Sequence, residues 1–130
     1  SIQFAAAASG SESWANFPLE QRRMADLIRA TRAQGVLFFS GDRHWCELST
    51  LTGNVPYPLH DLTASSMTQA HPRGTPTPNA NRSLPATFHQ PNAGALEVDW
   101  DAPDPLLTLR IVDQEGATRL EKRLRLGELR

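Results

Sequence analysis

The residues with the clearest chemical potential stand together in Gly41-Asp42-Arg43-His44. A carboxylate and an imidazole are hard and borderline ligands, which suit Fe, Zn, Mn or Ca. Side chains two positions apart on an extended strand share a face, so we expect Asp42 and His44 to point to one side together. The pattern is compatible with half of a metal site. The simpler alternative is a turn, in which Asp42 bonds nearby backbone amides and His44 is an ordinary polar residue.

The segment before this tetrapeptide would position it at the end of a strand. Residues Val36-Leu37-Phe38-Phe39-Ser40 form a continuous apolar run, which predicts a buried strand of a sheet covered on both faces. Open α/β sheets bind their ligands beyond the carboxyl ends of the strands. Asp42 and His44 follow directly after such an end, where a ligand site is expected.

Further elements can be predicted on both sides of this strand. An amphipathic helix is expected from about Pro18 to Gln34, with Gly35 just beyond its end. Weakly alternating segments predict two short strands at Cys46 to Thr52 and Leu59 to Ala64. Residues 65–94 are rich in Pro, Asn, Thr and Ser and predict a long irregular loop. Three alternating apolar segments between Leu96 and Leu126 then predict an antiparallel meander.

Size and composition restrict the class of protein. The chain has 130 residues, enough for one domain, and 39% of them are hydrophobic. No apolar run is long enough for a membrane span, and a net charge of −1 lacks the basic excess of a nucleic-acid-binding protein. The single cysteine, Cys46, excludes an internal disulfide. The short apolar segment Phe4 to Ala8 has no basic flank, so no signal peptide is visible.

Several segments in order resemble one family. They are Trp14-Ala15-Asn16-Phe17-Pro18, Glu20-Gln21-Arg22, Gly35 to His44, Glu47-Leu48-Ser49, Leu62 to Thr68 and Asn92 to Trp100. Together they resemble the C-terminal half of the PhoD-like alkaline phosphatases, which belong to the calcineurin-like metallophosphoesterases. The resemblance extends from about Trp14 to the end of the chain, and the order of the segments carries it more than any one segment.

The resemblance implies a fold and an activity. The fold would be α/β (α+β), part of a four-layer αββα sandwich with an N-terminal helix, a buried strand and a C-terminal antiparallel β-meander. The activity would be metal-dependent hydrolysis of phosphate monoesters or diesters. Asp42 and His44 match the family's Gly-Asp-x-His metal ligands, and the family's metals would be Fe and Ca. The family also suggests a periplasmic or secreted protein.

The family's other metal-binding motifs have no counterpart here. The sequence contains no earlier Asp-x-His, no second Gly-Asp and no Gly-Asn-His-Asp/Glu. Residues 1–130 therefore correspond to the C-terminal portion of such a domain, and the missing N-terminal half would supply most metal ligands. Because two ligands do not define a metal cage, the chain alone is expected to be inactive and to expose an unpaired sheet edge. The alternative is a non-catalytic, β-rich binding or structural module that kept the scaffold.

Other residues near the motif are weaker candidates. Arg43 either contacts a phosphate oxygen as a forked donor or points away, and alternation along a strand favours the second. Ser65 and Ser66 would lie near the site entrance by the resemblance, although turn bonding is the usual role of such serines. Trp45 is expected to pack and Cys46 to be a small buried hydrophobe. Three histidines in or near irregular segments either line a substrate channel or are surface residues, namely His60, His71 and His89.

Overall fold

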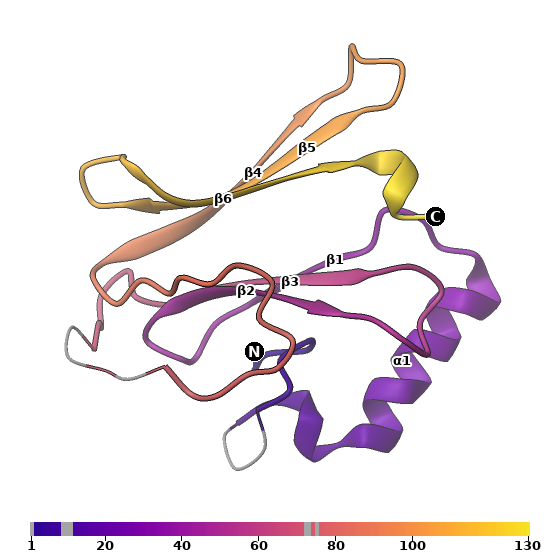
Figure 1. Ribbon diagram of the computed structural model, residues 1–130, viewed down its shortest axis with the longest axis horizontal. Helices are drawn as coiled ribbons and strands as arrows, with labels where there is room; N and C mark the ends of the chain where they lie inside the picture. Colours follow the sequence, from indigo (N-terminus) through magenta and orange to yellow (C-terminus); the bar gives the residue numbers. More distant parts are fainter. Residues whose placement is uncertain (1, 9–11, 72–73, 75) are drawn as a thin grey trace.

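The computed structural model describes residues 2–8, 12–71, 74 and 76–130 and contains one α-helix and two three-stranded sheets. Figure 1 shows them as three layers, with the helix against one face of the first sheet and the second sheet against the other. The elements in chain order are η1 (Trp14–Asn16), α1 (Pro18–Thr31), β1 (Leu37–Ser40), β2 (Cys46–Leu51), β3 (Leu59–Ala64), β4 (Asn92–Asp99), β5 (Leu106–Asp113), β6 (Thr118–Arg125) and η2 (Leu126–Glu128). The fold is thus mixed α and β.

Helix α1 begins as predicted and ends earlier. Pro18 occupies its first turn, where a missing N–H costs nothing, and Glu20 is the acidic residue of that turn. The prediction that it extends to Gln34 is wrong, because Arg32 adopts a left-handed conformation with φ of 54° and caps the helix. The N–H of Ala33 then donates to the carbonyl of Ile28 over 3.1 Å, which closes the last turn. No helix among the described residues is long and apolar enough to span a membrane.

The first sheet has the strand order β1-β3-β2, with β1 parallel and β2 antiparallel to β3. The antiparallel pairing of Leu59–Ala64 with Cys46–Leu51 confirms the two short strands. The prediction of a buried strand before Gly41 is wrong, because β3 takes the central position and leaves β1 at an edge, where Phe39 is 50% exposed. The fully buried residues of this sheet belong to β2 and β3 instead.

The two edges of the first sheet differ. The described residues of the long loop between β3 and Asn92 form no helix or strand, as predicted, and part of the loop returns along β2. Cys46 and Phe88 exchange backbone hydrogen bonds of 2.9 and 3.3 Å, and Ser83 donates to the carbonyl of Leu48. The edge of β2 is therefore covered. On the opposite side, β1 has no strand beyond it within the described part of the chain, which agrees with the expected open edge.

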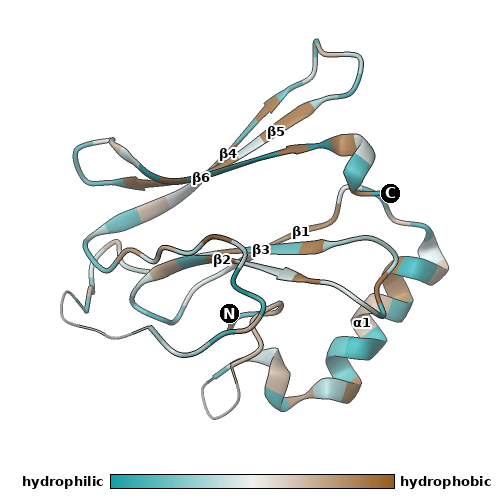
Figure 2. Cartoon of the chain, in the orientation of Figure 1, coloured by the Kyte–Doolittle hydropathy of each residue, from teal (hydrophilic) through white to brown (hydrophobic). Residues whose placement is uncertain are grey.

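The second sheet is the predicted meander, with the order β4-β5-β6 and antiparallel pairing throughout. Its central strand presents Leu107, Leu109 and Ile111 to the core, all buried. β4 begins earlier than the alternation suggests, at Asn92, and is mostly exposed because it forms the sheet edge. Figure 2 shows brown segments on β5 between more polar flanks.

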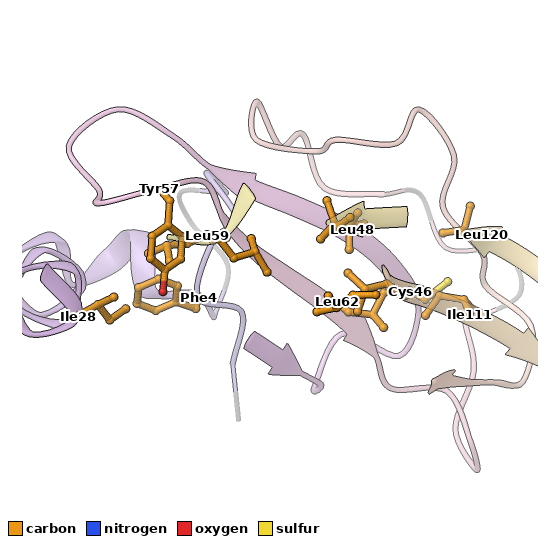
Figure 3. Packing of buried hydrophobic residues seen from close by; sticks show 14 residues of the cluster. Phe4, Ile28, Cys46, Leu48, Tyr57, Leu59, Leu62, Ile111 and Leu120 are labelled. Atoms are coloured by element: carbon orange, nitrogen blue, oxygen red, sulfur yellow. The ribbon is translucent and has the colours of Figure 1, made fainter. Parts of the chain in front are cut away.

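The hydrophobic core extends through both faces of the first sheet. Figure 3 shows Phe4, Ile28 and Tyr57 together near α1, whereas Ile111 and Leu120 of the meander lie near Leu48, Leu62 and Cys46. Gly94 makes the close contact between the sheets, since a Cβ at this position would lie 3.2 Å from Ala64 Cβ. The core therefore fixes the carboxyl end of β1, and with it the segment that follows.

Candidate functional site

The tetrapeptide after β1 is a tight turn rather than an extended tip. Asp42 has φ of 71° and His44 has φ of 56°, both in the left-handed region that side chains with a Cβ rarely adopt. The prediction of an extended tip is therefore wrong, and face alternation does not apply to this segment. The two left-handed residues turn the chain sharply between β1 and β2, so the side chains of the turn gather at one end of the sheet.

These side chains line a cleft of about 450 Å³. Asp42 and His44 lie on the same cleft, as predicted, although the geometry that brings them together is different. Three further histidine and acidic side chains reach the cleft from other parts of the chain. The lining residues are Glu12, Asp42, Arg43, His44, Trp45, His71, Gly74, Thr77 and His89.

An acidic pair stands on one wall of the cleft. A hydrogen bond between the carboxyl groups of Glu12 and Asp42 is the largest factor that raises the pKa of Glu12, and their charge repulsion adds to it. The Arg43 guanidinium opposes this rise. Two adjacent carboxyl groups repel each other when both ionise, and a cation bound between them would relieve that repulsion.

Arg43 lines the same cleft, so the expectation that it points to the other face is wrong. Its Nη2 donates to Thr77 Oγ1 over 2.7 Å, and its guanidinium lies 5.6 Å from the centre of the Trp45 ring. Both contacts fix the cation at the wall of the cleft. Trp45 is 3% exposed, so the packing role expected for it is confirmed.

Histidines from two parts of the long loop reach the turn. His44 Nδ1 and His71 Nε2 are 2.9 Å apart, and the N–H of His71 donates to the carbonyl of His44 over 3.2 Å. The His89 ring packs edge-on against Trp45 with centroids 4.9 Å apart. Burial lowers the pKa of His89, which favours its neutral ring. Of the three histidines considered from sequence, His71 and His89 line the cleft and His60 does not.

A buried polar network lies behind the wall of the cleft and holds it in place. Glu47, 1% exposed, accepts hydrogen bonds of 2.6 Å from both Gln3 and Arg82. Arg82 also donates to the carbonyl of Thr77 over 2.7 Å. The network thus ties the N-terminal segment, β2 and the long loop to the residue that holds Arg43. Both carboxylate oxygens of Glu47 are satisfied, one by an amide and one by a guanidinium, as low polarity requires, whereas Gln3 Oε1 has no hydrogen-bond partner among the described residues.

A second network holds the end of β1. The Ser40 hydroxyl donates to Asp61 Oδ1 over 2.7 Å, and the backbone N–H groups of Phe4 and Ala5 donate to Asp61 Oδ2. Burial raises the pKa of Asp61, and these three donors counteract the rise. Ser40 is therefore fixed immediately before Gly41, and the turn that carries the cleft residues begins from a rigid point.

Other candidates lie away from the cleft. Ser65 donates to the carbonyl of Trp45 over 3.2 Å, and Ser66 is fully buried, so neither lines the cleft. His60 lies on β3 rather than in an irregular segment, with Nδ1 2.9 Å from Thr50 Oγ1. Cys46 is buried as expected, and burial raises the pKa of its thiol to about 12.

Sequence reasoning did not single out Glu12 or Thr77. Glu12 follows a small polar segment, and Thr77 lies in the Pro-rich loop, so neither belongs to a motif or a periodic pattern. Their role depends on contacts between residues 34 positions apart, as for Arg43 and Thr77, or on the docking of the N-terminal segment. Only the folded chain brings them to the turn.

The side chains that line the cleft include the types that bind metal ions, but they are too few to form a complete ligand set. Asp42, Glu12 and His44 offer the oxygen and nitrogen atoms that metal ions prefer. However, no three His, Cys, Asp or Glu side chains among the described residues form a group that could hold a metal by themselves.

No family model, curated protein or solved structure matches this chain.

Proposed function

We propose that the chain forms one wall of a metal-dependent phosphoesterase site, as the C-terminal part of a PhoD-like alkaline phosphatase domain. One observation carries this proposal: Asp42, Arg43 and His44 line a single cleft directly after β1. These are the residues at which the sequence resembles the family's Gly-Asp-x-His motif. The reaction would be hydrolysis of a phosphate monoester or diester.

In this proposal Asp42 and His44 are the metal ligands from this chain, and Glu12 is a third candidate beside Asp42. The remaining ligands would come from the missing N-terminal half, since the described residues do not complete a metal group. The resemblance favours Fe and Ca. When bound, such metals neutralise phosphate charge and lower the pKa of a bound water.

Arg43 is proposed to bind the phosphate group. Its contacts with Thr77 and Trp45 hold the guanidinium at the cleft wall, so little side-chain entropy is lost when an anion arrives. A guanidinium pairs with phosphate oxygens through two parallel N–H donors. The expected role of Arg43 is therefore substrate affinity rather than metal binding.

The test compares the chain alone with a protein that joins it to the N-terminal half of such a domain. A phosphate monoester and a diester are assayed with Fe, Ca, Mn and Zn. We expect little turnover by the chain alone and metal-dependent turnover by the joined protein. Asp42→Asn and His44→Ala should each lower kcat of the joined protein by about 100-fold or more, because a metal ligand contributes several kcal/mol. Arg43→Ala should mainly raise KM.

The control is Arg23→Ala, which removes an exposed arginine of α1 far from the turn. It should leave kcat and KM unchanged. Absence of hydrolysis by the joined protein with every metal would contradict the phosphoesterase proposal and favour the non-catalytic, β-rich module. Robust turnover by the chain alone, lost in His44→Ala, would show instead that no further ligands are needed. If Arg43→Ala lowers kcat as much as His44→Ala with KM unchanged, Arg43 does not act through substrate affinity.

A further inference from the structure

His44 and His71 form a pair that the proposed reaction does not require. Their ring nitrogens, His44 Nδ1 and His71 Nε2, are 2.9 Å apart although the residues are 27 positions apart in the chain. The ring centroids are 4.8 Å apart with a tilt of 32° between the planes. A backbone hydrogen bond of 3.2 Å from His71 to the carbonyl of His44 holds the two residues together a second time.

When both imidazoles are neutral, a hydrogen bond between His44 Nδ1 and His71 Nε2 has only two arrangements. In one, His44 Nδ1 carries the proton and His71 Nε2 accepts it, which leaves a free lone pair on His44 Nε2. In the other, His71 donates to His44 Nδ1, and His44 Nε2 must carry a proton. Only the first arrangement leaves His44 a nitrogen that can bind a metal or take a proton.

We propose that His71 is a positioning residue that fixes His44 in the Nδ1–H form and presents His44 Nε2 to the cleft. Metal-binding histidines characteristically donate their second ring N–H to an acceptor, which sets both the protonated nitrogen and the ring orientation. Here that acceptor is an imidazole rather than the more usual carboxylate or carbonyl. The choice of the Nδ1–H form rests on the proposed function, whereas the contact between the two rings does not.

The pair also explains how a strained residue keeps a defined side-chain direction. His44 has φ of 56°, a conformation in which an imidazole gains little from local backbone contacts. The two bonds to His71 restrain both the backbone and the ring of His44. Removing His71 should therefore free the ring before it affects the rest of the turn.

The direct test measures ring protonation by long-range ¹H–¹⁵N NMR on the ¹⁵N-histidine-labelled chain at pH 8. We expect His44 to carry its proton on Nδ1. In His71→Leu it should change largely to Nε2–H, the form that free imidazole side chains prefer in water. His71→Gln places an acceptor oxygen near the position of Nε2 and should restore the Nδ1–H form. His60→Gln, a change to a histidine of β3 that does not line the cleft and is bonded to Thr50, is the control and should have no effect.

A second measurement separates this inference from the proposed function. In the joined protein, His71→Leu should lower metal affinity or kcat by about 10–100-fold, and His71→Gln should recover most of the loss. Nε2–H on His44 in the unmodified chain, or an unchanged His44 in His71→Leu, would overturn the inference. If the NMR result is as expected and no phosphoester is hydrolysed, the positioning by His71 stands and the phosphoesterase proposal fails.

Discussion

At the scale of single residues, His60 should make the stability of the chain depend on pH. The side chain is 5% exposed, and burial lowers its pKa from 6.5 to about 4, with Lys122 adding to the effect. In the unfolded chain the imidazole binds a proton at higher pH than in the folded chain. The free energy of unfolding that depends on neutral His60 is therefore complete above pH 6.5 and falls as the pH approaches 4.

The variant His60→Gln removes this dependence. Each pKa unit corresponds to about 1.4 kcal/mol, so between pH 7 and pH 5 the unmodified chain should lose about 2 kcal/mol more than the variant. Urea unfolding at the two pH values measures the difference. Thr50→Val removes the hydrogen-bond partner of His60 and keeps the titrating ring, so it should retain the pH dependence. Equal losses in His60→Gln and the unmodified chain would contradict the prediction.

The residues of the turn show how far sequence reasoning extends. The types and spacing of Asp42 and His44 were enough to predict that the two residues lie close together, and both line one cleft. Their left-handed conformation was not predicted, because Asp and His adopt it more often than most residues but still in a minority of cases. The error on Arg43 follows from it, since alternation requires an extended chain.

At the scale of elements, Gly94 of β4 should be intolerant of a side chain. A Cβ there would lie 3.2 Å from Ala64 Cβ and 3.3 Å from Leu62 Cδ2 of β3. Gly94→Val adds an isopropyl group, a Cβ and two methyl carbons, at this contact between the sheets. We expect a loss of about 1–3 kcal/mol in the free energy of unfolding, because overpacking forces the sheets apart.

The next residue supplies the control. Ala95→Val is the same kind of change on the exposed face of β4 and should stay within about 0.5 kcal/mol. Chemical unfolding of both variants checks the pair. A Gly94→Val chain as stable as Ala95→Val would mean that the sheets separate easily, which would contradict the tight packing at this position.

Elements with a strict period were the predictable ones. The meander followed from alternation, and α1 began where Pro18 indicated. Burial of β1 was mistaken because a continuous apolar run predicts cover on both faces but not the strand's place in the sheet. The end of α1 was mistaken because Arg32, three residues before Gly35, already adopts a left-handed conformation and caps the helix.

At the scale of the whole molecule, the first sheet is covered on both faces and along β2, whereas β1 has no further strand beside it among the described residues. An edge strand with an exposed Phe39 favours association with another strand. We expect the isolated chain to self-associate with rising concentration in sedimentation velocity. Phe39→Lys should reduce this association, because an edge lysine opposes strand pairing.

Leu19→Lys is the matched control, since Leu19 of α1 is 80% exposed and distant from the sheet edge. It should leave the association unchanged. A chain that stays monomeric at high concentration, or one whose association responds to Leu19→Lys and not to Phe39→Lys, would contradict a role for the β1 edge.

The two left-handed residues after β1 also bear on the balance between stability and side-chain chemistry at this turn. A non-glycine residue in such a conformation costs about 1 kcal/mol or more, and glycine at either position would relieve it. Glycine at Asp42 or His44 should therefore stabilise the fold while it removes a side chain from the cleft, so stability and any chemistry of this turn would change in opposite directions.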